Sequence, residues 1–452
     1  MIKKNKIVLI LSLLFSGVLF FNCASTNGIS GGTRIKTQNY DSLDEEPFYS
    51  QNAETFFEKK LSNGIPVIIK KSKNQNSCAV RLVIDSVPLS DSFNKSGLEK
   101  ITLELMRKGT SKYSELYISS MEYTDSTVFT TKVHQDYLEY GISSQKDRLD
   151  TVVEIFAQTF KNPLMDEAEF NEITDQLRNS ASPLLTQVYK ILNSQDKYFS
   201  PCYLTEQASV SYKDVLDYQK GLLNAARITI IASGNFSDED VENLYKLLEN
   251  NFSSLKKFNY RKKQPSKKLV QYGKKITFVE KNAYQNISAL GFADIPFPLG
   301  DSYISYALLS LYLDDLIYSH VKEKHSAAQD AGTGVLLSKL NIGIISIYDI
   351  SSVDKATSNL NEMLENSLTE DFIEKKLDSY KRIYTSFVMN SEIKAEKTLD
   401  QMASSLVYCG DAKEYLKRPY KISKITAAQV REVFDKYVNG KICWVINNIM
   451  TK

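Results

Sequence analysis

A short helical stretch holds the residues whose types and spacing come nearest to a chemical site. The segment GLEKITLELMRKGT, Gly97 to Thr110, places Lys100 and Glu104 four residues apart, with Leu103 directly before Glu104. Residues four apart lie on one face of a helix, so the ammonium and the carboxylate can form an ion pair worth roughly a few tenths of a kcal/mol. A catalytic zinc ion requires three protein ligands, and a single carboxylate falls short of that number.

Histidine, the commonest ligand of catalytic zinc, is scarce in this sequence. The chain contains only His134, His320 and His325. We expect His134 in a strand, whereas the other two are five residues apart, which a helix places on nearly opposite faces. These three residues therefore do not predict a metal site.

The cysteines outside the N-terminal region show no CxxC spacing, so they predict neither a zinc knuckle nor a redox pair. They are Cys78, Cys202, Cys409 and Cys443. We interpret them as small buried hydrophobic residues, although an exported protein can also form a disulfide.

Length and charge limit the class of protein. With 452 residues the chain is too long for one hydrophobic core, which favours two large domains. The formal net charge is only +2, so the composition gives no electrostatic argument for nucleic-acid binding.

The N-terminus has the pattern of an export signal. Lys3, Lys4 and Lys6 precede an apolar run, and the stretch LFFNC ends at Cys23. This pattern resembles the lipidation site of bacterial lipoproteins, although that family prefers small residues where Phe21 and Asn22 stand. The small polar stretch after Cys23 predicts a flexible tether. We expect residues 1–22 to be a signal peptide and residues 23–54 a lipidated tether that holds the protein on a membrane, facing the periplasm or the cell surface. An uncleaved signal anchor, or a free cysteine beside an ordinary cleavage site, are the alternatives.

The body of the chain reads twice through one plan of strands and helices. FFEKKLSNGIPVIIKKS predicts two strands around the turn Asn63-Gly64, and CAVRLVIDSV predicts a third before the helix at Gly97. ITFVEKN, NISALGFADI and the helix SYISYALLSLYLDDLIYSHVKEK repeat this order later in the chain.

The ends of the two copies carry the firmest sign of duplication. SYKDVLDYQKGLLNAARITIIASG begins at Ser211 and TAAQVREVFDKYVNGKICWVIN begins at Thr426. Each starts with a hydroxyl residue suited to a helix N-cap and ends in an apolar strand that we expect at the centre of a sheet.

Strands and helices that mix without strict βαβ alternation predict an α+β fold, in which helices cover a sheet in each domain. We expect an N-terminal domain over residues 55–255 and a C-terminal domain over residues 276–452. The basic stretch between them, residues 256–275, is interpreted as a solvated linker.

These features together resemble the insulinase/pitrilysin family of zinc peptidases, which includes the mitochondrial processing peptidase. The likeness rests on LSNGIPVIIKK, on GLEKITLELMRKGT and on the duplicated plan, and it covers the chain from about Phe56 to its end. It implies two homologous domains that close like a clamshell around an unfolded peptide.

The resemblance also implies where a zinc site would be. The family's catalytic helix carries an inverted His-x-x-Glu-His motif, which places Lys100 and Glu104 at the two histidine positions and Leu103 at the general base. An ammonium cannot bind zinc, and a leucine cannot activate water. The family's third ligand aligns with Asn179, with Glu172 two turns earlier. We therefore expect a protein that has lost the family's zinc cofactor.

A second loss is expected in the C-terminal domain. Active members use an Arg and a Tyr there to hold the substrate carbonyl, and the stretch KEKHSAAQ places Lys322 and Gln329 at those positions. Lys322 keeps a charge but lacks the planar guanidinium, and Gln329 can still donate a hydrogen bond. An ordinary helix end followed by a loop is an equally good interpretation of this stretch.

Three functions follow from the resemblance. The leading expectation is a non-catalytic subunit that binds unfolded peptide or pairs with an active family peptidase. The alternatives are a zinc peptidase with a rewired site and a stand-alone peptide-binding lipoprotein.

Overall fold

A computed structural model describes residues 55–89, 92–178, 183–266, 275–279, 287–320, 330–350 and 360–448. The expected signal peptide, Cys23 and the tether lie outside the described residues. So do Asn179, His325, Lys322 and Gln329.

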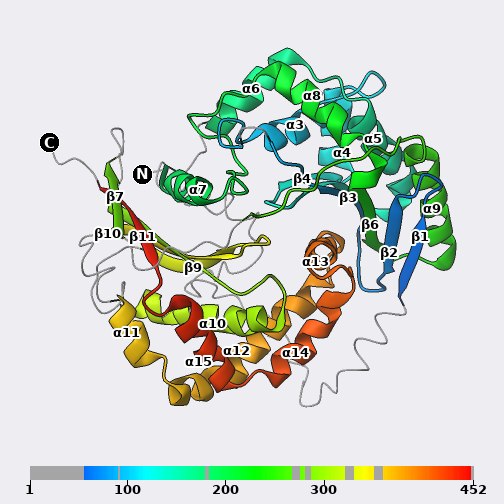
Figure 1. The fold of residues 1–452 in the computed structure, drawn as a ribbon. Helices are drawn as coiled ribbons and strands as arrows, with labels where there is room; N and C mark the ends of the chain where they lie inside the picture. The colour runs from blue at the N-terminus through cyan, green and yellow to red at the C-terminus, as the bar shows by residue number, and fades with distance from the viewer. Residues whose placement is uncertain are drawn as a thin grey trace.

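Two sheets organise the described chain (Figure 1). The first has the order β1-β2-β6-β3-β5-β4 and the second has the order β7-β11-β8-β10-β9. The strands of the first sheet are β1 Phe56–Lys60, β2 Pro66–Lys71, β3 Cys78–Asp85, β4 Val128–Val133, β5 Tyr137–Ser144 and β6 Ile228–Gly234. Those of the second are β7 Lys275–Val279, β8 Ile287–Asp294, β9 Asp330–Leu336, β10 Ile342–Ile350 and β11 Cys443–Asn448.

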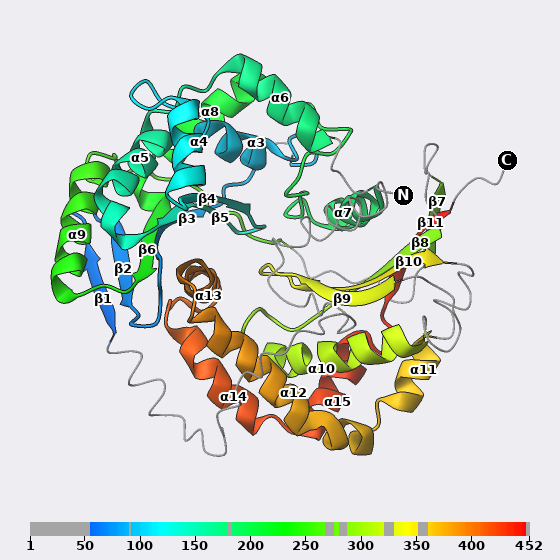
Figure 2. The same cartoon turned by 180° about the vertical axis from the view of Figure 1, so that it is seen from behind.

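Helices surround both sheets (Figures 1 and 2). In the first half of the chain they are α3 Leu98–Met106, α4 Glu115–Thr124, α5 Leu149–Lys161, α6 Glu167–Arg178, α7 Pro183–Gln195, α8 Tyr212–Leu222 and α9 Asp238–Phe252. In the second half they are α10 Asp301–Tyr318, α11 Leu360–Ser367, α12 Glu370–Ser391, α13 Ala395–Cys409, α14 Arg418–Lys424 and α15 Ala427–Val433. This arrangement confirms the expected α+β class.

The two sheets repeat one topology. In the first sheet, β6 runs parallel to β2 and antiparallel to β3. In the second sheet, β11 runs parallel to β7 and antiparallel to β8. Ser211 and Thr426 both cap a helix through a capping box, so the expected N-caps are confirmed. The strands that follow, β6 and β11, lie inside their sheets, as their apolar sequences predict.

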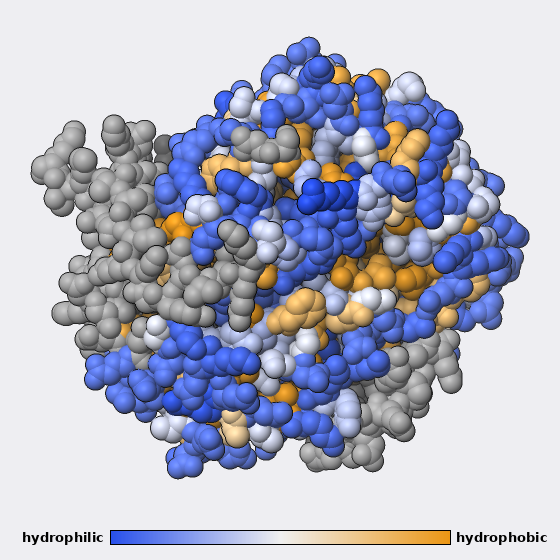
Figure 3. All heavy atoms as spheres, viewed as in Figure 1, coloured by the Kyte–Doolittle hydropathy of each residue, from blue (hydrophilic) through white to orange (hydrophobic). Residues whose placement is uncertain are grey.

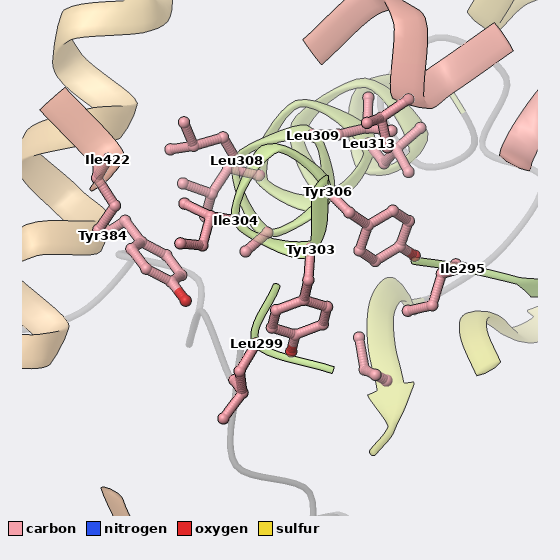
Figure 4. Close-up of a cluster of buried hydrophobic side chains, with 14 of the residues drawn as sticks. Ile295, Leu299, Tyr303, Ile304, Tyr306, Leu308, Leu309, Leu313, Tyr384 and Ile422 are labelled. Carbon is pink, nitrogen blue, oxygen red and sulfur yellow. The ribbon is translucent and has the colours of Figure 1, made fainter. Parts of the chain in front are cut away.

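The core of the second half forms around α10, which is apolar on all sides. Tyr303, Ile304 and Leu308 of this helix are buried, and Tyr384 and Ile422 pack against the same cluster (Figure 4). An α-helix without a polar face is stable only when it is enclosed, and α10 is enclosed by the second sheet and by α12, α14 and α15.

Each half supplies one helix to the sheet of the other half. α7 packs against β8 and β11 of the second sheet, with Val188 and Leu192 in one cluster with Phe292 and Val445. α13 packs against β3, β5 and β6 of the first sheet. Both views place α7 on the second sheet and α13 beside the first (Figures 1 and 2). The expected pair of domains is therefore interlocked.

The stretch after α9 is held against the first half and is not a freely solvated connector along its described part. Lys262 forms an ion pair with Asp85 at 2.5 Å, and the backbone N–H of Lys263 donates to the carbonyl of Ser86. Lys263 itself is buried. A carboxylate at the end of β3 thus fixes the basic stretch.

Two further expectations need correction. Of the four cysteines, Cys78 and Cys443 are buried, whereas Cys202 is half-buried and Cys409 is exposed. All four are free thiols in the structure. His134 lies directly after β4, in the connection to β5, and not within a strand.

Candidate functional site

Helix α3, which holds Lys100, Leu103 and Glu104, is built as the sequence predicts. Gly97 precedes the helix with φ 82°, and a Cβ at this position would lie 2.6 Å from the Cα of Leu204. Only glycine fits both that backbone conformation and that close approach. Leu98, Ile101 and Leu105 are buried in the first core, which confirms the expected apolar stripe.

The polar face of α3 is closed by a network of ionic hydrogen bonds centred on Glu104. The ammonium of Lys100 lies 2.5 Å from Glu104 Oε1, so the expected ion pair is confirmed. Thr131 on β4 donates its hydroxyl to the same oxygen at 2.5 Å. Arg107 Nε donates to Glu104 Oε2 at 2.8 Å. Both carboxylate oxygens are thus engaged, and α3 is tied to β4.

The electrostatics of this network keep Glu104 ionised. Burial opposes its ionisation, but the positive charges of Lys100 and Arg107 outweigh burial and lower the pKa of Glu104 from 4.5 to about 2. Hydrogen bonds from Lys100 and Thr131 act in the same direction. The carboxylate therefore serves as a structural anion at neutral pH.

Leu103, which the resemblance places at the general-base position, is a core residue. Leu103 is 0% exposed and belongs to the first hydrophobic core. Glu172, the nearby alternative for a third ligand, lies on α6 and accepts a hydrogen bond from Gln176 at 2.8 Å. Among the described residues, no group of three His, Cys, Asp or Glu side chains could hold a metal ion. An ammonium, an alkyl group and one paired carboxylate do not form a zinc-binding donor set.

A second polar cluster, which sequence reasoning missed, lies in the interior. The guanidinium of Arg81 on β3 contacts the carboxylate of Glu139 on β5 and lies 2.6 Å from Asp400 Oδ1 on α13. His134 Nε2 lies 2.7 Å from the other oxygen of Glu139, and Lys132 contacts Asp400. Burial disfavours these charges, but the mutual attraction raises the pKa of Arg81 and lowers those of Glu139 and Asp400.

A neighbouring carboxylate joins three parts of the chain. Asp136 accepts the hydroxyl of Tyr198 at 2.7 Å and the hydroxyl of Tyr408 on α13 at 3.3 Å. It also accepts the backbone N–H of Lys339 at 3.0 Å. Both polar clusters therefore connect the two halves, which assigns them a structural role.

The available sequence signal for these clusters was a charge inside an apolar strand. Arg81 interrupts CAVRLVID and Glu139 interrupts YLEYGISS, and both side chains are buried. Buried charges of this kind need a partner, but a strand pattern does not indicate which residue provides it.

Within the part of the chain that the structure describes, no helix combines the length and the apolar character needed to cross a membrane. The view in Figure 3 is largely hydrophilic, with hydrophobic side chains gathered in separate patches.

Comparison with family models identifies both halves. Residues 66–197 match the model described as insulinase (peptidase family M16), and residues 209–384 match the model described as the peptidase M16 inactive domain. A search of curated proteins finds no match to this sequence.

Solved structures share the fold at low sequence identity. A protease from Helicobacter pylori has a TM-score of 0.74 and 15% identity, and the match covers 87% of this chain and 99% of the other. A peptidase M16 inactive domain from Pseudomonas fluorescens has a TM-score of 0.72 and 13% identity, covering 88% and 98%. The periplasmic protease PqqL from Escherichia coli has a TM-score of 0.69 and 14% identity, covering 88% of this chain but 46% of PqqL.

The repeated sheet topology, the helix at Gly97 and the two family matches lead to one conclusion. The chain is a homologue of the insulinase (M16) peptidase family and carries both the N-terminal domain and the inactive C-terminal domain of that family.

Proposed function

We propose that this protein is a non-catalytic M16 homologue that binds unfolded peptide and serves as the partner subunit of an active family peptidase. The observation that carries the proposal is the closed face of α3. Glu104 is engaged by Lys100, Thr131 and Arg107, and Leu103 is enclosed in the core. The face that would hold zinc and its general base has become part of the packing.

The edge of the first sheet supports the peptide-binding role. β4 is the last strand of its sheet, and Thr131 links it directly to α3. An edge strand presents N–H and C=O groups to which an extended peptide can add by main-chain hydrogen bonds. Peptide binding at such an edge requires no metal.

The length of one solved relative supports the partner role. The matched region is 46% of PqqL, so a single PqqL chain is long enough for a second unit of this size. We propose that the unit described here pairs with a second one on another protein. The partner that we propose is a family peptidase with an intact His-x-x-Glu-His motif, encoded in the same organism.

The test combines this protein with such a peptidase. We expect the purified protein alone to contain no stoichiometric zinc and to leave a quenched unfolded peptide intact. Adding the active peptidase should give a stable complex and a higher turnover than the peptidase alone. About one zinc per chain, lost on Glu104→Gln substitution, would show that α3 is still a metal site. Absence of a complex, together with tight peptide binding, would favour a stand-alone peptide-binding lipoprotein.

A matched variant separates loss of metal from loss of the base. Lys100→His, Glu104→His and Asn179→Glu together restore three ligand types while Leu103 is retained. We expect this variant to bind zinc without hydrolysis, because Leu103 still stands at the general-base position and cannot activate water. Rapid peptide hydrolysis by this variant would show that a carboxylate at position 103 is not required.

We also propose that the mature protein is a lipoprotein acylated at Cys23. The positive N-terminal residues, the apolar run and the polar stretch after Cys23 support this. A fatty-acid analogue should label the wild-type protein but not Cys23→Ser. Equal labelling of both proteins would exclude Cys23 as the attachment site.

A further inference from the structure

The outer face of the second part of α12 combines apolar and basic side chains. Ile383 is 39% exposed, Phe387 is 41% exposed, and Ile393, just after the helix, is 56% exposed. Arg382 and Lys394 are exposed beside them. Single exposed apolar residues are ordinary. Three lie within eleven positions with two basic residues, and we name these five residues the α12 ridge.

The charge of this face is positive. The exposed positions between residues 379 and 390 are Ser379, Arg382, Ile383, Ser386, Phe387 and Asn390, none of which is acidic. The acidic residues of α12 itself lie in its first part: Glu370, Asp371, Glu374 and Asp378. Glu392, at the end of the helix, contacts the buried ammonium of Lys70.

The ridge lies where the chain enters the folded body. Phe56 begins β1, and its ring centroid is 5.9 Å from the ammonium of Lys70. That ammonium contacts Glu392, the residue directly before Ile393. Phe56, near the start of the described chain, therefore lies beside one end of the ridge, and a tether acylated at Cys23, as proposed above, would lead from the membrane to this side of the protein.

We propose that the α12 ridge rests on the surface of an anionic lipid membrane. Ile383, Phe387 and Ile393 would enter the interface between headgroups and acyl chains, while Arg382 and Lys394 would bind anionic headgroups. β1 and β4 are opposite edges of the first sheet, so this orientation keeps β4 away from the lipid. The proposal rests on the proposed acylation of Cys23, and it is independent of a partner peptidase.

The experiment uses the full lipidated chain purified from membranes. In a Cys202→Ser, Cys409→Ser background, a bimane label is attached to Ile383→Cys or Ile393→Cys. Tyr123→Cys, at a position 92% exposed on α4, is the control on another helix. The proteins are reconstituted into vesicles of three parts phosphatidylcholine to one part phosphatidylglycerol, with or without brominated acyl chains. Bromine quenches bimane only at contact distance, so quenching reports insertion.

We expect quenching at residues 383 and 393 and none at residue 123. The quenching at residue 393 should be lost when Arg382→Glu and Lys394→Glu are added, because reversed charges repel the headgroups. Equal quenching at all three positions, or none at 383 and 393, would overturn the proposal. One further outcome is a label at 383 or 393 that is shielded from water without vesicles and stays unquenched with them. That result would also overturn the proposal, because the chain's own N-terminal segment would then cover the ridge.

Discussion

Residues on the polar face of α3 form a network that fixes the helix in the fold. The sequence predicted the pair between Lys100 and Glu104 because both lie on one helix. It did not predict that Thr131 and Arg107 would complete the network. Thr131 comes from another strand, so its contact with Glu104 depends on packing and not on a local repeat.

The depressed pKa of Glu104 predicts a specific dependence of stability on pH. Because the folded-state pKa is about 2 and the usual value is 4.5, the stabilisation is complete above about pH 4.5 and is lost as the pH falls towards 2. Each unit of pKa corresponds to about 1.4 kcal/mol, so the contribution is on the order of 3–4 kcal/mol at neutral pH. In urea titrations, Glu104→Gln should be less stable than wild type at pH 7, and the two proteins should converge near pH 2.

Glu115→Gln is the matched control, because Glu115 forms a more exposed ion pair with Lys108. Such surface pairs contribute little, typically about 0–1 kcal/mol. A stability difference between wild type and Glu104→Gln that stays constant from pH 7 to pH 2 would contradict the role assigned to Glu104.

The buried charges mark the limit of prediction at this scale. Arg81 and Asp400 are 319 positions apart in the sequence, yet they form a hydrogen bond of 2.6 Å. An arginine in an apolar strand indicates that a partner is needed, but the identity of the partner follows only from the way α13 crosses the first sheet.

At the scale of elements, the sequence predicted where helices begin, but it did not predict which sheet each helix packs against. Ser211 and Thr426 cap helices as predicted, because a cap depends on residues within one turn. α7 and α13 also have apolar faces, but an apolar face does not specify which sheet covers it. Both helices pack on the sheet of the opposite half, and the sequence contained no signal for that exchange.

Because α7 packs on the second sheet, a substitution in α7 should affect the second half of the chain. Leu192 on α7 is 0% exposed and packs in one cluster with Phe292 and Val445 of the second sheet. Leu192→Ala should lower the free energy of unfolding by about 2–5 kcal/mol, because it leaves a cavity. Hydrogen exchange should increase most in β8 and β11, although Leu192 belongs to the first half. Leu244→Ala on α9, which is equally buried in the first core, should instead increase exchange in the first sheet. The same pattern of hydrogen exchange in both variants would contradict the packing of α7 on the second sheet.

At the scale of the whole molecule, the two halves resemble separate domains in sequence but not in packing. The duplicated plan and the sheet topology agree, so the expectation of two homologous units described the order of elements well. It did not include the contacts of Asp136 with Tyr408 and of Arg81 with Asp400, which cross between the units. Together with the packing of α7 and α13, these contacts bury residues of each half against the other half.

The last prediction follows from that packing. Fragments 55–255 and 276–452, expressed separately, should not unfold cooperatively, because each lacks the helix that covers one face of its sheet. The first would also remove Asp400 from the buried cluster, so Arg81 would keep Glu139 as its carboxylate partner but lose the contact to α13. We expect both fragments to bind a hydrophobic dye and to lack near-ultraviolet circular dichroism. The control is the intact chain with a protease site inserted within residues 267–274 and cleaved after folding. Its two pieces should stay associated and unfold in one transition. A cooperative transition in either isolated fragment would show that the exchanged helices and the buried charges add to the stability of that half without being required for its fold.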